Sequence, residues 1–236
     1  MSAIYKREFK SYFTSPLAYI FIVVIIYYTS RLFVNYNVMY ATADVSLIYS
    51  SALQILTVII PLLTMRLFTE EKRQKTDQCL FTAPVGLFSI VFGKFLAACT
   101  VFLCGMMIFV VYALTLYGFA GALEWILNFG NFLGLFLLGT AYIAIGLFIS
   151  CMTENQVVAA ILSFIVNLLM FELDTYAVQE VSNPILQSVM YNVSFYPRYA
   201  EFASGILSIP SVVFFLSIIF VFNFLTVRVL ERRRWA

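Results

Sequence analysis

Six apolar runs, separated by polar breaks, divide this chain of 236 residues. Five of them approach or exceed the roughly 20 residues that an α-helix needs to cross the hydrocarbon layer of a bilayer. Apolar runs of this length with few charges are typical of transmembrane helices. The sequence therefore predicts a single-domain, all-α, polytopic membrane protein with six transmembrane helices, at about residues 17–34, 45–67, 95–117, 129–151, 157–171 and 209–227.

The composition excludes several classes of protein. Apolar residues make up 63% of the chain and charged residues 11%, whereas a soluble domain has about 25% charged residues. Too little polar surface remains to coat a soluble globule. The chain has no histidine, the commonest metal ligand and the usual acid–base group near neutral pH, so neither a metal site nor a catalytic site is predicted. No ionisable residue falls near the middle of a run, which disfavours a proton-coupled carrier.

The positive charges predict how the helices are oriented. With six crossings and the N-terminus inside, 12 of the 14 Lys and Arg residues lie inside, and only Arg31 and Arg198 lie outside. Lys and Arg concentrate in cytoplasmic loops, so we expect both termini to be cytoplasmic. The inner cations are Lys6, Arg7, Lys10, Arg66, Lys72, Arg73, Lys75, Lys94, Arg228, Arg232, Arg233 and Arg234.

Residues 1–16 have the pattern of an interfacial helix. At about 100° per residue, Lys6, Arg7 and Lys10 share one side. The other side carries Ile4, Tyr5, Phe9, Tyr12 and Phe13. Such a helix lies in the headgroup layer. Glu8 projects toward the apolar side, and two interpretations stay open: an edge position that reaches water, or a contact with another part of a complex.

The fifth run and the segment after it have unusual lengths and compositions. Residues 157–171 would span roughly 22 Å as a helix, less than the ~30 Å hydrocarbon layer. The outer segment 172–208 is broken by Pro184 and Pro197 yet is rich in apolar residues. We expect it to form short helices that fold back toward the bilayer, where other parts of the protein bury them.

The longest polar interval on the predicted inner side is residues 66–94. It includes the acidic pair Glu70-Glu71, then Lys72, Arg73 and Lys75, and then Thr76-Asp77-Gln78, and a break follows at Ala83-Pro84. Lys94 stands at its end, where we expect the side chain to snorkel to the membrane surface. From the residues alone, this interval is either a solvated connector or a contact site for a soluble partner.

No nucleotide-binding motif is present. Six residues separate Gly86 from Gly93, and Phe95 follows Lys94, whereas a phosphate loop has four residues between its glycines and a Ser or Thr after the lysine. The outer segment of 37 residues is too short for an ATPase domain. We therefore expect no enzyme activity and no cofactor in this chain, so any energy would come from another chain.

Three stretches of the sequence resemble a known family. EEKRQKTDQCLFTAPVGLFSIVFGK resembles the cytoplasmic loop of type-2 ATP-binding-cassette (ABC) exporter permeases, with Lys75 at a usual glycine position and Cys79 at a usual leucine position. The opening YKREFKSYFTSPLAYIF and the closing YAEFASGILSIPSVVFFLSIIFVFNFLTVRVLERRRW are similar to those of the gliding-motility (Gld) subgroup.

The resemblance implies the permease subunit of an exporter in a bacterial plasma membrane. Its partners would be a second permease, identical or related, and two cytoplasmic ATPase subunits that carry ATP and Mg; some members add a membrane-anchored subunit outside. The loop 69–88 would couple to the ATPase, with the N-terminal helix beside it. The implied contact residues are Glu70, Glu71, Lys72, Arg73, Thr76, Asp77, Gln78, Leu80 and Phe81 of the loop, and Lys6, Arg7, Glu8 and Lys10 of the N-terminal helix.

Other functions stay open. Gln54, Thr57 and Asn167 are candidates for lining a substrate path at a dimer interface. The first alternative is a nucleotide-independent channel or secondary carrier, in which the inner loop is a passive connector. The second is a membrane scaffold of an ATPase complex that transports nothing. No nucleic-acid partner is expected.

Overall fold

The computed structural model describes residues 2–40, 44–75, 86–120, 125–180 and 183–234, and every regular element in these ranges is a helix. Within these ranges, six helices are long and apolar enough to cross a membrane, which confirms the all-α class and the expected number of membrane-length helices. The elements are α1 (Ser2–Thr14), α2 (Pro16–Leu32), the π-helix η1 (Phe33–Val38), α3 (Ser46–Thr64), α4 (Arg66–Arg73), α6 (Leu87–Ala120), α7 (Trp125–Met152), α8 (Gln156–Glu180), α9 (Pro184–Val193), α10 (Phe195–Ala203) and α11 (Ile209–Arg234).

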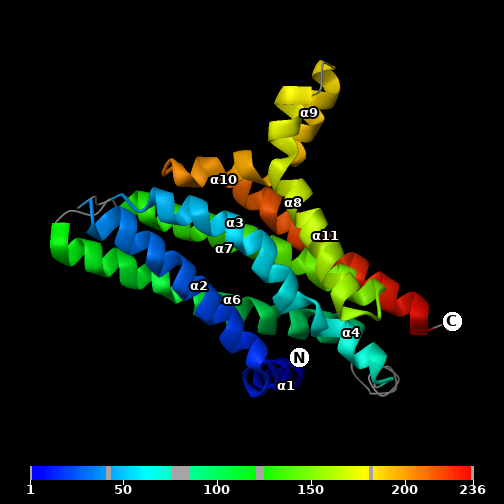
Figure 1. Ribbon diagram of the computed structural model, residues 1–236. Helices are drawn as coiled ribbons and strands as arrows, with labels where there is room; N and C mark the ends of the chain where they lie inside the picture. The colour runs from blue at the N-terminus through cyan, green and yellow to red at the C-terminus, as the bar shows by residue number, and fades with distance from the viewer. Residues whose placement is uncertain (1, 41–43, 76–85, 121–124, 181–182, 235–236) are drawn as a thin grey trace.

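The chain turns sharply between α1 and α2. Ser15 has an extended backbone, with φ −99° and ψ 157°, as expected for a residue that precedes a proline. Pro16 then opens α2 at a position where a helix loses nothing by the missing N–H. Figure 1 shows α1 nearly end-on while α2 runs across the view, so the two helices cross at a steep angle.

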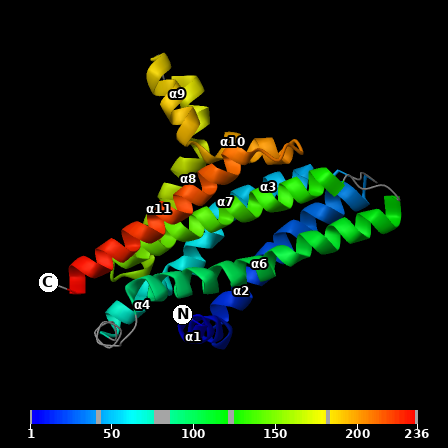
Figure 2. The same cartoon turned by 180° about the vertical axis from the view of Figure 1, so that it is seen from behind.

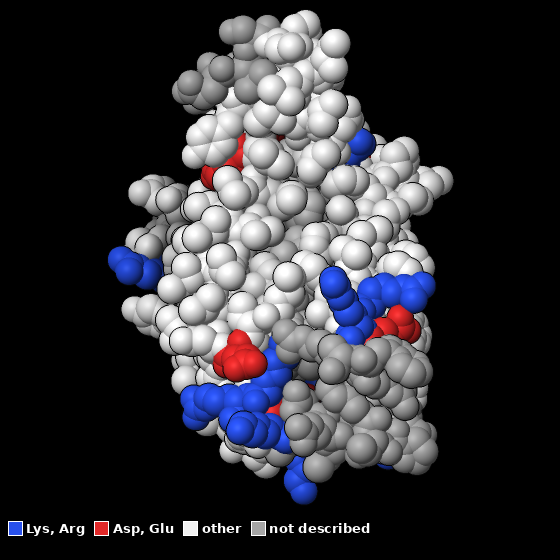
Figure 3. Space-filling view, turned by 90° about the vertical axis from the view of Figure 1, so that its right-hand side faces the viewer, with Lys and Arg blue, Asp and Glu red and all other residues white. Residues whose placement is uncertain are grey.

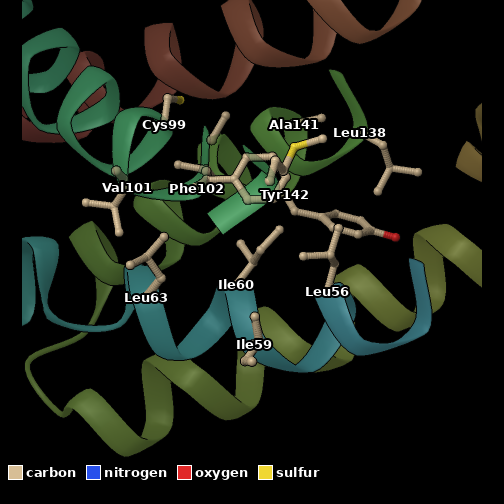
Figure 4. Packing of buried hydrophobic residues seen from close by; sticks show 14 of the residues in the cluster. Leu56, Ile59, Ile60, Leu63, Cys99, Val101, Phe102, Leu138, Ala141 and Tyr142 are labelled. Atoms are coloured by element: carbon tan, nitrogen blue, oxygen red, sulfur yellow. The ribbon is translucent and has the colours of Figure 1, made fainter. Parts of the chain in front are cut away.

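α7 is the centre of the bundle. It packs against α3, α6, α8, α10 and α11, and Figure 2 shows it running between α11 and α6, with α3 behind it. Its glycines allow this close approach: a Cβ on Gly139 would lie 2.2 Å from Phe102 of α6, and one on Gly146 2.2 Å from Thr64 of α3. Small residues at helix crossings bring the backbones close together. Figure 4 shows Phe102 and Tyr142 packed above the aliphatic side chains of α3.

The helices reach beyond the apolar runs. α8 continues through Glu172 and Asp174 to Glu180, so the fifth crossing is a full-length helix and not a short one. The outer segment then forms α9 and α10. α10 lies against α7 and buries its Phe195, Tyr199 and Phe202. α9 buries none of its residues and projects from the body (Figures 1 and 2).

The ends of the bundle differ in character. α1, α4 and the last turns of α11 lie at one end, and α9 and α10 at the other (Figure 1). In the face that Figure 3 presents, most charged side chains gather toward one end, and the broad middle is almost uncharged. An uncharged middle is the expected surface for a protein whose surroundings are lipid.

Candidate functional site

Four charged residues meet where α1, α4 and α6 come together, and we call them the Lys94 cluster: Arg7, Glu8, Glu71 and Lys94. Lys94 Nζ lies 2.9 Å from Glu71 Oε1 and 3.2 Å from Glu8 Oε1. Arg7 Nη2 lies 2.7 Å from Glu8 Oε1 and 2.9 Å from Glu71 Oε1. Two cations thus balance two carboxylates, and each carboxylate pairs with both cations.

Lys94 is the buried centre of this cluster, with a side chain that is 1% exposed. Its third partner is the Leu67 carbonyl oxygen, to which Nζ donates a hydrogen bond of 2.8 Å. An ammonium group has three donors, and all three have acceptors here. The Phe68 ring, with its centroid 5.1 Å from Nζ, adds a cation–π contact. A buried charge is tolerated in a protein when it is paired in this way.

Further contacts fix α1 on the bundle. A Cβ on Gly93 would lie 3.1 Å from Ile4, so the glycine allows α1 to lie close to α6. The Tyr5 hydroxyl is 3.1 Å from Thr100 Oγ1, and the Tyr12 hydroxyl donates to the Leu63 carbonyl oxygen at 3.0 Å. The apolar side of α1 therefore packs partly against α6 and α3.

α4 is bound on its other side to the end of α7. Lys72 is buried, and its Nζ donates to the carbonyl oxygens of Cys151 and Thr153. The backbone N–H of Phe68 donates to Ser150 Oγ at 3.0 Å. These bonds and the Lys94 cluster hold α4 between α1 and α6 on one side and α7 on the other.

The pKa values of two cluster members, Glu8 and Arg7, are shifted toward the ionised forms. Burial raises the pKa of the Glu8 carboxyl, but the charge of Lys94 and the hydrogen bond and charge of Arg7 outweigh it, so that the pKa lies below its usual value. Burial also lowers the pKa of the Arg7 guanidinium, but its contacts with Glu8 and Glu71 raise it overall. Opposite charges in contact favour the ionised forms of both partners.

A polar cavity of about 350 Å³ opens beside the cluster, between α1 and α4. Arg66 lines it, donates to Ser11 Oγ at 3.0 Å and forms an ion pair with Glu70 at 3.0 Å. The cavity has three cations and three carboxylates around it, so no single sign of charge dominates. Its lining residues are Arg7, Glu8, Ser11, Tyr12, Arg66, Leu67, Glu70, Glu71, Gln74 and Lys94.

The structure changes the interpretation of two residues. Lys94 does not snorkel to the surface, because two carboxylates and a carbonyl hold its ammonium inside the protein. Glu8 does not sit at an edge in water, since its side chain is 13% exposed and paired with Lys94. The partner of Glu8 is in the same chain.

The expected loop residues divide into three groups. Glu71 and Lys72 are bound within the chain. Glu70 is partly exposed and Arg73 is exposed, as are Lys6, Arg7 and Lys10 of α1. Thr76, Asp77, Gln78, Leu80 and Phe81 lie outside the described residues.

The path candidates lie away from this site. Gln54 is exposed on α3, and the buried Thr57 donates its hydroxyl to the Gln54 carbonyl oxygen at 2.7 Å. Asn167 is fully buried on α8, which packs against α3.

Six membrane-length helices, with a buried charge cluster at one end, define a multi-pass membrane protein. Residues 6–170, which include the whole Lys94 cluster, match the family described as ABC-2 family transporter protein. Because the match covers more than half of the chain, the protein belongs to this family and is a permease subunit of an ABC transporter. Membrane subunits of this family generally pair with an ATPase subunit and a membrane partner. No curated protein matches the sequence.

Proposed function

We propose that this permease subunit couples ATP hydrolysis by a separate cytoplasmic ATPase to the export of a substrate. The main support for this proposal is that α4 is attached to α1 and α6 through Glu71 and to α7 through Lys72. α4 begins the polar interval whose sequence resembles a coupling loop. A force on that interval would move α1, α6 and α7 together, because α4 cannot shift without breaking its buried charged contacts with them.

In this proposal the residues around α4 have two roles. Glu71 and Lys72 fix α4 to the bundle, while Glu70 and Arg73 are accessible to a partner. The contact would continue through Thr76, Asp77 and Gln78, with Leu80 and Phe81 as apolar anchors. Charged and amide groups can form charge-assisted hydrogen bonds in a polar groove, and buried apolar anchors contribute much of the binding energy of an interface.

The distribution of cations supports the orientation of the proposal. Twelve of 14 cations fall on the side of α1 and α4 when the six crossings are counted, and such a bias marks the cytoplasmic side. Both termini and the Lys94 cluster would then face the cytoplasm of a bacterium.

The remaining members of the complex follow from family resemblance. The transporter would contain two permeases, identical or related, and two ATPases that bind ATP and Mg, with no cofactor or catalytic residue in this chain. Similarity to the gliding-motility subgroup, based on the two ends of the sequence, adds a membrane-anchored subunit outside as a further partner.

The experiment is to reconstitute the permease with its ATPase in liposomes and measure ATP hydrolysis and substrate movement. Thr76→Ala and Asp77→Ala should lower the permease-stimulated ATPase rate while membrane insertion stays normal. Gln187→Ala, on the protruding α9, is the control and should leave the rate unchanged. Stimulation that is unchanged in both loop variants contradicts the coupling role, and hydrolysis without movement of any substrate would support a scaffold.

A further inference from the structure

Arg31 is a cation at an unusual depth in the membrane. It lies 15 residues beyond Pro16, the first residue of α2, which is about 22 Å along a helix. With Pro16 placed at the near surface of a hydrocarbon layer ~30 Å thick, the Cα of Arg31 lies in the outer half of the membrane, several ångströms below the far surface. The side chain is exposed, and none of the ion pairs among the described residues involves it. A charge in this position is costly unless it reaches a counter-charge.

A groove of about 470 Å³ runs along the same face, from Tyr27 on α2 to Tyr40 beyond η1. Arg31 and Asn35 line its middle, and aromatic side chains flank them on both sides. The four tyrosines of the groove are Tyr27, Tyr28, Tyr36 and Tyr40. Aromatic residues with a polar tip are enriched where hydrocarbon meets water, so the groove crosses the boundary at which lipid headgroups lie.

The π-helix η1 builds this groove. In a regular α-helix, Tyr36 would stand about 140° and Tyr40 about 180° from Arg31, at 100° per residue. In η1 the N–H of Met39 bonds the Val34 carbonyl oxygen, five residues back, at 3.0 Å. The wider turn rotates Tyr36 and Tyr40 back toward the side of Arg31, and both tyrosines line the groove together with Arg31. Single π-turns inside helices occur frequently at functional sites.

We propose that this groove binds the phosphate group of a phospholipid, in the leaflet on the side of the membrane away from α1. The guanidinium group of Arg31 matches the geometry of a phosphate and can bond it with two parallel N–H donors. Its long side chain can extend along the groove toward the headgroup layer. The hydroxyl group of Tyr40, which lies further from Pro16 along the chain than Arg31, can supply a further donor.

This inference does not depend on coupling to an ATPase or on which terminus faces the cytoplasm. It rests on Arg31, on the tyrosines beside it and on the distance from Pro16. A second copy of the chain, bringing an acidic side chain to Arg31, is the competing occupant, and the test separates the two.

The test is native mass spectrometry of the purified permease mixed with phosphatidylglycerol or with diacylglycerol of the same acyl chains. The wild type should retain phosphatidylglycerol, and Arg31→Gln should reduce the retained fraction roughly tenfold, the effect of losing a charged hydrogen bond. Arg31→Lys keeps the charge and should retain an intermediate fraction. Arg228→Gln is the control, because it removes an exposed cation at the opposite end of the bundle.

Any of three results would overturn the proposal. The first is retention of phosphatidylglycerol by Arg31→Gln at the wild-type level, and the second is equal retention of diacylglycerol by the wild type. The third comes from a photo-crosslinking amino acid in place of Tyr27, which is 68% exposed. In membranes it should label phospholipid; if it labels a second copy of this chain instead, that copy covers the groove.

Discussion

The ammonium group of Lys94 lies 2.9 Å from a carboxylate oxygen of Glu71. Glu71 stands near the end of α4, and Lys94 lies in the second turn of α6. Their ion pair therefore joins α4, at the start of the polar interval, to α6, which contains the end of that interval. Glu8, from the N-terminal helix, binds the same ammonium group at 3.2 Å. Segments that are far apart in the sequence are thus held together where the proposed partner would bind.

Replacing Lys94 by methionine should destabilise the permease. The substitution leaves Glu8 and Glu71 with Arg7 as their remaining cation in the cluster, and breaking a buried ion pair costs about 3–5 kcal/mol. Thermal unfolding of the protein in nanodiscs measures the effect. Arg228→Gln, which removes an exposed ion pair, should change stability by less than about 1 kcal/mol. Equal midpoints for the two variants would show that the cluster contributes no stability.

Lys72 and Arg73 are adjacent in sequence but should respond differently to substitution. Lys72→Met removes the buried donor that binds the Cys151 and Thr153 carbonyl oxygens, so it should lower stability by about 1–3 kcal/mol. Arg73 is exposed, so Arg73→Met should leave stability unchanged and lower ATPase stimulation. Unfolding midpoints and ATPase rates, measured on both variants, check this division. A stable Lys72→Met protein would contradict the role given to Lys72.

Gly146 should not tolerate a methyl group. A Cβ there would lie 2.2 Å from Thr64 Oγ1 and 2.9 Å from Thr64 Cβ, and overpacking a well-packed core typically costs 1–3 kcal/mol. Gly118→Ala is a matched control, because it also lies in a transmembrane helix and has nothing within 4 Å of the added atom. Gly146→Ala should lower the unfolding midpoint and Gly118→Ala should not. If both variants unfold like the wild type, α3 and α7 do not pack this closely.

Acid should release α1 from the bundle. The pKa of Glu8 is lower in the folded protein than its ordinary value of 4.5. The ionised carboxylate therefore stabilises the fold above pH 4.5, and this contribution is lost as the pH falls through the folded pKa. A spin label at Lys6, which is exposed, should gain mobility only below pH 4.5. In Glu8→Gln this acid step should disappear; its persistence would assign the step to another group.

The crossings could be predicted from sequence because they depend on length and polarity alone. The ends of the helices could not. α8 continues past Phe171 because a helix does not stop where polar residues begin, and the next proline is Pro184. α6 likewise begins at Leu87, within the polar interval.

The Lys94 cluster could not be predicted from sequence patterns. Glu8, Glu71 and Lys94 are brought together by long-range packing, and no local spacing relates them. One signal was present: Glu8 on the apolar side of an amphipathic helix needed a buried cation, and Lys94, beside the small Gly93, was available. The role of Lys72 had no such signal, because its acceptors are backbone carbonyl oxygens at the end of another helix.

The most direct test of the account is photo-crosslinking from Arg73 in the complete complex in membranes. Arg73 is the last residue of α4 and is exposed. With a photo-crosslinking amino acid in its place, the permease should form an adduct with the nucleotide-hydrolysing subunit. The same amino acid at Tyr191, exposed on α9 at the opposite end, should form none. An adduct of the ATPase at Tyr191 and none at Arg73 would contradict the claim that force from the ATPase enters through α4.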